Sequence, residues 1–191
     1  MNIVVYLGAR TGKNPLFREK ARELGVWIAG QGHRLVYGGS AIGLMGELAD
    51  AALSEGGEVT GVEPRFFVDA VLQHQGVQDL IVVETMQERK QKMISLGDAF
   101  IAFPGGTGTL EEISEIISMT CLGLTDKPCI IYNINGYYDD LFRFLDRMEQ
   151  ENFFGNEDRN NVIEVTCLED IEKTLETAGM SDTGRNRLYS G

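Results

Sequence analysis

The sequence predicts an α/β protein: a doubly wound, mostly parallel sheet of about seven strands in one Rossmann-like domain. Short β-branched runs alternate with helical patterns along the chain. Most of these runs are apolar on both faces, which is typical of a parallel sheet covered by helices on both sides. Glycine-rich segments follow the first, second and fifth runs, at the edge where such sheets bind ligands. The 191 residues suffice for one such domain, which we expect over residues 1–178.

The individual elements follow in order from the same patterns. Strands are expected at residues 3–7, 34–37, 58–62, 80–83, 99–103, 129–132 and 162–165. Helices are expected at residues 15–31, 43–56, 86–97, 109–124, 138–151 and 169–178. Residues 179–191 are polar and have no period, so we expect a loose tail there.

The charge balance excludes one class of partner. The chain carries 29 acidic against 17 basic side chains, a formal net charge of -12. A general nucleic-acid or anionic-membrane binder needs a basic surface, so neither nucleic acid nor membrane is expected as a partner. A small anion is still compatible with this charge, because beyond about 8 Å the field is screened and local donors decide.

Cysteine usage and the absence of targeting signals predict a cytoplasmic protein. Cys121, Cys129 and Cys167 are scattered and never in C-x-x-C spacing, which predicts reduced thiols and no metal site. The N-terminus lacks the basic region and long apolar run of a signal peptide. No stretch approaches the roughly 20 apolar residues of a membrane span.

Two familiar nucleotide-binding patterns do not fit the glycine segments. A dinucleotide site needs G-x-G-x-x-G after the first strand and an acidic residue ending the second. This chain offers Gly8 and Gly12 after the first strand, and its second strand ends in Tyr37, Gly38 and Gly39. The G-K-[ST] ending of a P-loop is missing as well, so NAD, FAD and ATP are not expected ligands.

The segment FPGGTGT predicts a phosphate-binding loop. Pro104 stops the fifth strand, and the glycines after it allow a close approach of the backbone to a ligand. A helix expected to open at Thr109 would direct free N–H groups toward the loop. The residues expected to hold the anion are Gly105, Gly106, Thr107, Gly108 and Thr109. The alternative is a tight strand-to-helix turn that binds nothing.

Glu112 has two possible roles. Thr109 and Glu112 match the capping box T-x-x-E, in which the glutamate only stabilises the helix start. The helix pattern also leaves Glu111 and Glu112 near the mouth of the glycine loop. A carboxylate beside a phosphate is unfavourable unless it has a chemical task or a cation, and the sequence leaves both roles open.

The segment TMQERKQKM offers the cation. Thr85 and Glu88 form another capping box after the fourth strand, again at the ligand edge. Arg89 falls within the apolar stripe of this helix, so it needs a partner. There are two alternatives to a role in binding: the aliphatic stem of Arg89 packs while its charge reaches solvent, or Arg89 pairs with a structural acid. Lys90 lies close to the same stripe, and helix geometry does not choose between the two.

Three stretches, YGGSAIGLMGELADAAL, TMQERKQKM and PGGTGTLEE, together resemble the LONELY GUY family of cytokinin riboside 5'-monophosphate phosphoribohydrolases. Older labels call such proteins lysine decarboxylase-like. The resemblance spans roughly residues 3–152, and M-x-E-R-K combined with P-G-G-x-G-T-x-x-E is specific to the family. It implies a Rossmann-like homodimer that hydrolyses the N-glycosidic bond of nucleoside 5'-monophosphates, often N6-prenylated AMP, to free base and ribose 5-phosphate.

The resemblance also implies roles for particular residues. Arg89 and Glu112 take the positions of the catalytic pair. The phosphate and substrate positions are Gly105, Gly106, Thr107, Gly108, Thr109, Gly38, Gly39, Met86, Lys90, Gly8 and Arg10. Relatives carry a C-G-S-S-like stretch after the first strand where this chain has Gly8, Ala9, Arg10 and Thr11, so Arg10 is expected to add a contact. No metal is implied, and no cofactor, because no lysine stands in a pyridoxal-binding context.

Four points stay open in the sequence. Residues 113–124 are apolar on nearly every side, which predicts a helix buried either in a homodimer contact or deep in a monomer. A non-catalytic carrier of a phosphorylated pterin or molybdenum cofactor is the rival to the enzyme. Neither a requirement for a prenylated base nor the physiological role follows from the residues.

Overall fold

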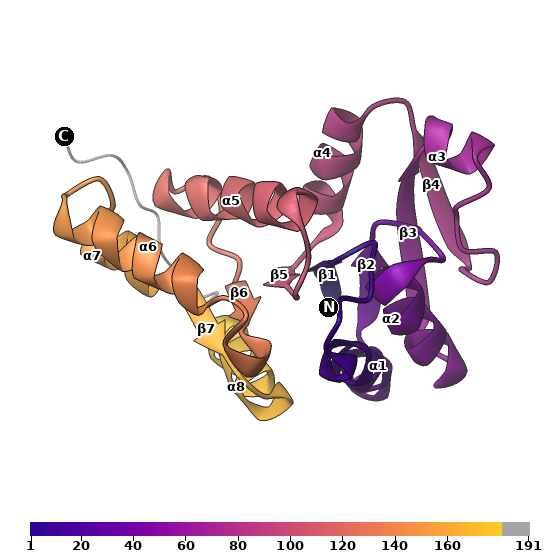
Figure 1. Ribbon diagram of the computed structural model, residues 1–191, viewed down its shortest axis with the longest axis horizontal. Helices are drawn as coiled ribbons and strands as arrows, with labels where there is room; N and C mark the ends of the chain where they lie inside the picture. Colours follow the sequence, from indigo (N-terminus) through magenta and orange to yellow (C-terminus); the bar gives the residue numbers. More distant parts are fainter. Residues whose placement is uncertain (181–191) are drawn as a thin grey trace.

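The computed structural model describes residues 1–180, and its centre is one seven-stranded sheet in the order β4-β3-β2-β1-β5-β6-β7. Every neighbouring pair of strands is parallel, so the sheet is parallel throughout rather than mostly so. Figure 1 labels the strands across the sheet. The strands are β1 (Asn2–Tyr6), β2 (Arg34–Tyr37), β3 (Glu58–Pro64), β4 (Asp79–Val83), β5 (Ala99–Ala102), β6 (Cys129–Tyr132) and β7 (Val162–Val165). All seven lie within two residues of their expected bounds, and the predicted fold class is confirmed.

Within residues 1–180, eight α-helices connect and cover these strands. They are α1 (Pro15–Gly30), α2 (Gly43–Ser54), α3 (Arg65–Asp69), α4 (Met86–Leu96), α5 (Thr107–Cys121), α6 (Asp139–Gln150), α7 (Asn156–Asn160) and α8 (Leu168–Met180), with a short 3-10 turn η1 at Ile134–Gly136. The sequence missed α3 and α7 because five residues are too short to show a helical period. The helix α8 runs two residues beyond its predicted end, and the remainder of the expected tail lies outside the described residues.

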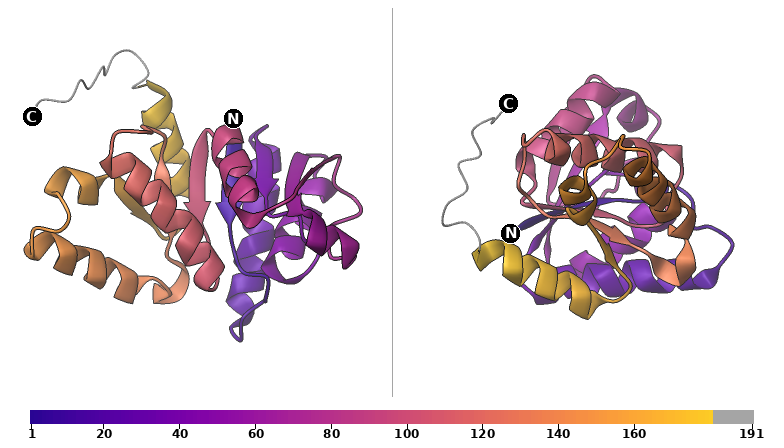
Figure 2. Two further views of the ribbon diagram at one scale, coloured as in Figure 1. Left: turned by 90° about the horizontal axis from the view of Figure 1, so that it is seen from above. Right: turned by 90° about the vertical axis from the view of Figure 1, so that its left-hand side faces the viewer.

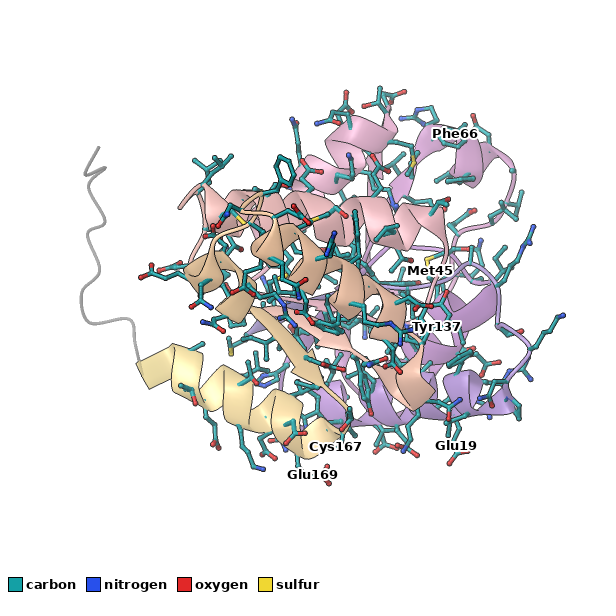
Figure 3. All side chains as sticks on the ribbon, turned by 60° about the vertical axis from the view of Figure 1, so that its left-hand side comes forward. Glu19, Met45, Phe66, Tyr137, Cys167 and Glu169 are labelled. Carbon is teal, nitrogen blue, oxygen red and sulfur yellow. The ribbon has the colours of Figure 1, made fainter. Side chains whose placement is uncertain are left out.

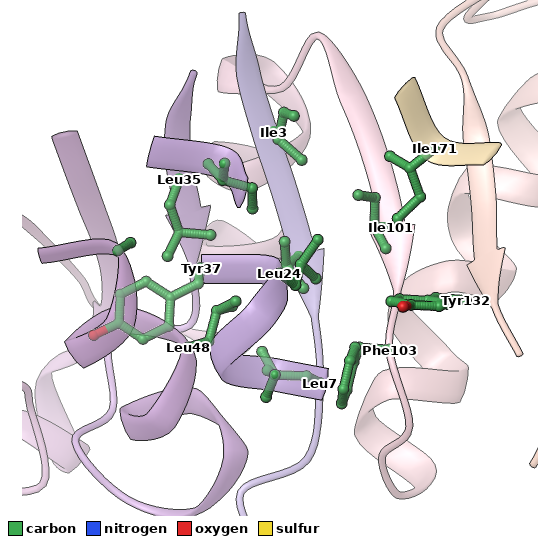
Figure 4. Close-up of a cluster of buried hydrophobic side chains, with 14 of the residues drawn as sticks. Ile3, Leu7, Leu24, Leu35, Tyr37, Leu48, Ile101, Phe103, Tyr132 and Ile171 are labelled. Atoms are coloured by element: carbon green, nitrogen blue, oxygen red, sulfur yellow. The ribbon is translucent and has the colours of Figure 1, made fainter. Parts of the chain in front are cut away.

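The helices form two layers, one on each face of the sheet (Figure 2). One face packs against α1, α2 and α8, with Leu24, Leu48 and Ile171 in its buried cluster (Figure 4). The other face packs against α4, α5 and α6, and there Met93 and Ile116 are fully buried. Strand residues therefore have apolar neighbours on both sides, which explains the continuous apolar runs in the sequence.

Local signals fix where the helices begin. Asn14 caps α1 by accepting a hydrogen bond from the backbone N–H of Leu16, with Pro15 in the first turn. Thr85 caps α4 by accepting from the N–H of Glu88 at 3.1 Å. Glu88 in turn accepts from the N–H of Glu84 rather than that of Thr85, so the predicted capping box is shifted by one residue. None of the helices within residues 1–180 combines the length and apolar character needed to cross a bilayer.

The order of the strands locates the ligand edge. The chain builds the sheet outward from β1 through β2, β3 and β4, then returns to the other side of β1 with β5. Ligands in doubly wound sheets bind beyond the carboxyl ends of the strands at such a reversal point. The segments that follow β1 and β5 meet there, because the N–H of Gly8 donates to the carbonyl of Pro104 at 3.2 Å.

Candidate active site

The three predicted glycine loops lie side by side at the carboxyl edge of the sheet. The loop after β1 sits between the other two: it bonds Pro104 on one side, and the carbonyl of Gly8 accepts from the N–H of Leu44 on the other at 3.1 Å. A methyl group on Gly43 would overlap the backbone of Ala9, so these loops touch without intervening side chains. Gly8 is buried in this contact, whereas Arg10 projects from the exposed part of the same loop.

The loop after β5 leads into α5, which begins at Thr107, two residues earlier than predicted. Thr107 and Gly108 are exposed, and their backbone N–H groups lie in the first turn, where no helical carbonyl is available. Thr109 is 3% exposed and its side chain fills the space that Gly105 leaves open, since a methyl group on Gly105 would overlap its hydroxyl. The buried Thr109 side chain therefore packs against the loop from inside the protein. The exposed backbone N–H groups are the donors that are available to bind an anion.

Arg89 and Glu112 come together as a buried ion pair. The guanidinium Nη1 of Arg89 lies 2.8 Å from Oε1 of Glu112, and the two side chains are 10% and 8% exposed. Arg89 comes from α4 and Glu112 from α5, 23 residues apart in the chain. The predicted alternative in which the Arg89 charge reaches solvent is wrong, because helix α4 directs it into the molecule.

The capping role considered for Glu112 is also wrong. Gly106, not Thr109, is the N-cap of α5, and the carboxylate of Glu112 turns toward Arg89. Because α5 starts earlier than predicted, Thr109 already belongs to its first turn and is no cap for Glu112. The carboxylate of Glu112 therefore accepts a hydrogen bond from a side chain of α4 and does not cap its own helix.

The environment of Glu112 changes its acidity. Burial raises the pKa of this carboxyl above its ordinary value, the Arg89 charge opposes the rise, and the neighbouring Glu111 adds to it. Tyr6 lies in the same region, and burial together with Glu112 raises the pKa of its phenol. A carboxylate with a raised pKa and a fixed cation partner is suited to accept a proton from water at neutral pH.

Two backbone segments also contact the Arg89 side chain. Its Nε donates to the carbonyl of Val62 at 3.0 Å, which ties the side chain to the end of β3. Its Nη2 lies against Gly38, where an added methyl group would overlap the guanidinium. Gly38 is thus required by the packing of Arg89, a use of glycine that the loop pattern did not reveal.

The remaining predicted residues lie around this pair and differ in their exposure. Lys90 lies 2.7 Å from Oε1 of Glu111 and 3.1 Å from Oε2 of Glu115, so it forms an outer ion cluster with these two residues. Arg89, and not Lys90, is therefore the cation that pairs with Glu112. Met86 is exposed at the start of α4. Gly39 is buried with a positive φ of 85°, a backbone conformation that glycine adopts without strain.

Sequence reasoning missed Glu63. The predicted third strand ends at residue 62, but β3 continues to Pro64 and places Glu63 at the ligand edge, 2% exposed. Its Oε2 has no hydrogen-bond partner in the described chain and lies against Gly39. Burial raises the pKa of Glu63 to about 7, and the nearby Arg89 opposes the rise. A single acidic residue at the carboxyl end of an apolar strand was the available signal.

Within residues 1–180, no three His, Cys, Asp or Glu side chains are grouped so that they would hold a metal ion. All three cysteines carry free thiols, and Cys129 is fully buried, which raises the pKa of its thiol to about 12.

The chain is similar to proteins of one known family over most of its length. The family model described as "Possible lysine decarboxylase" matches residues 45–176. A cytokinin riboside 5'-monophosphate phosphoribohydrolase of Rhodococcoides fascians is 43% identical over 176 residues, covering 91% of this chain and 87% of that protein. Another from Arabidopsis thaliana is 36% identical over 174 residues, covering 91% of this chain and 82% of that protein.

Solved structures share the fold as well. The molybdenum cofactor binding protein of Rippkaea orientalis superposes with a TM-score of 0.69 at 25% identity, over 92% of this chain and 95% of that one. The molybdenum cofactor carrier protein of Chlamydomonas reinhardtii has a TM-score of 0.72 at 20% identity, over 94% and 98% of the two chains. These matches show the fold class, a Rossmann-like α/β protein. Within that class, the chain belongs to the LONELY GUY family, whose curated relatives are phosphoribohydrolases.

Proposed function

We propose that this protein hydrolyses the N-glycosidic bond of a nucleoside 5'-monophosphate of the AMP type, prenylated or not at N6. The observation that carries the proposal is the buried pair of Arg89 and Glu112 beside a loop with free N–H groups. Relatives that carry the phosphoribohydrolase name at 36–43% identity support the same reaction. The N–H groups at Gly105–Thr109 would hold the 5'-phosphate, far from the bond that breaks.

The chemistry assigns a task to each member of the pair. A water oxygen bonds to C1' of the ribose as the bond from C1' to the purine nitrogen breaks, and the electron pair leaves with the purine. Glu112 accepts a proton from that water and stabilises the positive charge that develops on the sugar. The purine nitrogen takes up one proton, so the products are free base and ribose 5-phosphate. Arg89 fixes the Glu112 carboxylate and balances the phosphate charge with its planar set of donors.

Other predicted positions would shape the substrate pocket. Gly38 and Gly39 would face the sugar, while Gly8 and Arg10 would lie beside the phosphate from the loop after β1. Met86 and Lys90 would border the site from the first turn of α4. Gly8 and the Gly38–Gly39 turn are backed by the close loop contacts described above, and Arg10 adds a positive charge where the relatives' C-G-S-S-like stretch has none.

We also propose a homodimer built on the exposed face of α5. Leu110, Ser114, Ser118 and Leu122 follow one another at four-residue spacing and are all exposed. The hydroxyl of Ser114 donates to the carbonyl of Leu110 at 2.6 Å, and that of Ser118 to the carbonyl of Ser114 at 2.9 Å. This face therefore presents small, internally satisfied side chains between two leucines, which suits close packing of a second helix. The face is less apolar than the sequence led us to expect.

A cytoplasmic location is proposed on the cysteine chemistry. Cys121, Cys129 and Cys167 all carry free thiols, a state that a reducing compartment maintains. Fractionation of cells that express the tagged protein tests this, and recovery with secreted or membrane fractions would contradict it.

The activity is tested by incubating the purified protein with AMP and with N6-isopentenyl-AMP. We expect release of adenine or N6-isopentenyladenine together with ribose 5-phosphate, detected by chromatography. The rival function is a carrier of a phosphorylated cofactor, since two structural neighbours are named as a molybdenum cofactor binding protein and a molybdenum cofactor carrier protein. If neither nucleotide is cleaved while a phosphorylated pterin co-purifies with the protein, the carrier replaces the enzyme.

A further inference from the structure

The loop after β5 has an arrangement of carbonyl groups that the glycine motif does not explain. Three successive carbonyls each accept a hydrogen bond from another part of the chain. The hydroxyl of Tyr138 donates to Phe103 at 2.8 Å, the N–H of Gly8 donates to Pro104 at 3.2 Å, and the hydroxyl of Tyr137 donates to Gly105. Both tyrosines come from the connection between β6 and α6, more than 30 residues further along the chain (Tyr137 is labelled in Figure 3).

The connection that carries the tyrosines is itself fixed. Asn133 is 4% exposed and its side-chain oxygen accepts from the N–H of Tyr138 at 2.7 Å. Its side-chain nitrogen donates to Asp139 at 2.8 Å and to Glu164 of β7 at 2.6 Å. The tyrosine hydroxyls are therefore presented by a turn anchored to the sheet, not by a free loop.

Because of peptide geometry, the hydrogen bonds to these carbonyls also set the directions of the backbone N–H groups in the loop. In a planar trans peptide the C=O and the N–H point in opposite directions. The carbonyl of Gly105 and the N–H of Gly106 belong to one peptide, so when Tyr137 bonds that carbonyl, the N–H of Gly106 points away from the tyrosine. The carbonyl of Pro104 and the N–H of Gly105 likewise share a peptide, so the bond from Gly8 to Pro104 makes the N–H of Gly105 point away from Gly8. Neither N–H has a hydrogen-bond partner within residues 1–180. An anion site needs such free donors and needs carbonyl oxygens kept away from it.

We propose that Tyr137 is a positioning residue for the substrate phosphate, holding the carbonyl of Gly105 away so that the N–H of Gly106 faces the anion beside the N–H of Gly105. Tyr138 assists by keeping the carbonyl of Phe103 turned away from the anion. This inference rests on the proposed function, in which the glycine loop binds a 5'-phosphate. Tyr137 carries the sharper test because the residue is 45% exposed and its ring packs edge to face with that of Phe17, so removal of the hydroxyl alone leaves the packing in place.

The experiment compares Tyr137→Phe with wild type and with Tyr132→Phe. Tyr132 lies in β6 just before the same turn and its ring contacts Phe103, but its hydroxyl holds none of the three loop carbonyls, which makes it a matched control. Calorimetry with ribose 5-phosphate and with inorganic phosphate gives the binding constants, and initial rates with AMP give KM and kcat. The melting temperature of each variant is recorded alongside.

We expect Tyr137→Phe to weaken ribose 5-phosphate binding about fivefold to tenfold, the loss typical of one hydrogen bond. KM for AMP rises by a similar factor while kcat stays within about twofold, and Tyr132→Phe matches wild type in every measurement. Binding by Tyr137→Phe equal to wild type overturns the proposal. Equal losses in both variants overturn it too, because they would reflect general packing around Phe103.

The design separates this inference from the proposed function. If wild type binds ribose 5-phosphate but does not cleave AMP, the proposed reaction fails, and weaker binding by Tyr137→Phe still supports the positioning role. If wild type binds neither ribose 5-phosphate nor inorganic phosphate, the positioning role falls together with the phosphate site. Tyr138→Phe, which leaves a buried carbonyl unpaired, is expected to weaken binding as well but to lower the melting temperature.

Discussion

Two of the ion pairs between helices α4 and α5 are formed by adjacent residues, and they differ in how far their carboxylates are buried. Arg89 and Glu112 are 2.8 Å apart, and Lys90 and Glu111 are 2.7 Å apart. The side chain of Glu112 is 8% exposed, whereas that of Glu111 is 60% exposed. An exposed pair is screened by water and contributes little, but a buried carboxylate has a shifted pKa and a fixed direction. Burial, not pairing distance, distinguishes the pair suited to chemistry.

The largest expected effect comes from removing the buried charge. Glu112→Gln keeps the shape and the hydrogen-bond acceptor for Arg89 but loses the proton acceptor, so kcat for AMP should fall by about a thousandfold. The dissociation constant for AMP, measured by calorimetry, should change less than about fivefold. A variant that keeps more than a tenth of the wild-type kcat would contradict the assignment.

A large effect is also expected from Arg89→Lys. Lysine keeps the charge but cannot bond Glu112 and the Val62 carbonyl at once with a planar group, so kcat/KM should fall about a hundredfold. Arg147→Lys on α6 is the matched control, because Arg147 forms an exposed pair with Glu151 and should tolerate lysine. Similar activity of the two variants would show that the fork of donors is not needed.

A smaller effect is expected from Gly38→Ala. The added methyl group overlaps the Arg89 guanidinium and must displace it, so kcat/KM should fall about tenfold and stability by about 1–3 kcal/mol. Gly30→Ala, near the end of α1, adds a methyl group with no atom within 4 Å and serves as control. Urea unfolding and AMP cleavage measured on both variants check the prediction, and an active, stable Gly38→Ala would refute the packing argument.

Glu63→Gln should change the pH dependence of stability. The folded protein holds the Glu63 proton up to about pH 7, whereas the unfolded chain releases it near pH 4.3. The stability present below pH 4.3 is therefore lost as pH rises to about 7, and Glu63→Gln escapes this loss. Its free energy of unfolding relative to wild type should rise by about 1–2 kcal/mol between pH 4 and pH 8.

The control for that measurement lies on the same strand. Glu58, at the start of β3, is exposed and paired with Arg34, so Glu58→Gln should differ from wild type by less than about 0.5 kcal/mol at every pH. Denaturant unfolding at several pH values gives both curves. Parallel curves for wild type and Glu63→Gln would show that Glu63 titrates as an ordinary carboxyl.

The smallest effect is expected from Glu111→Gln. This substitution breaks the outer contact to Lys90, but Glu115 remains within 3.1 Å of the lysine, so kcat/KM should change less than about threefold. A loss comparable with that of Glu112→Gln would mean that the two neighbouring carboxylates share the reaction.

The sequence predicted the parts of the site that depend on local patterns. The stripe of α4 showed that Arg89 needs a partner, and the glycine spacing located the loop after β5. The choice between capping and catalysis at Glu112 depends on where α5 begins and on how α4 packs against it, and both are tertiary properties. Glu63 and Tyr137 were missed for the same reason, since their partners lie in segments that only the folded sheet brings together.

The central claim is that Arg89 and Glu112 act as one unit, and a double-mutant cycle in kcat/KM for AMP tests it most directly. We predict that the protein with both Arg89→Lys and Glu112→Gln is about as slow as Glu112→Gln alone, because one substitution already disables the unit. Losses that multiply to about a hundred-thousandfold would show that the two residues act independently and would contradict the account.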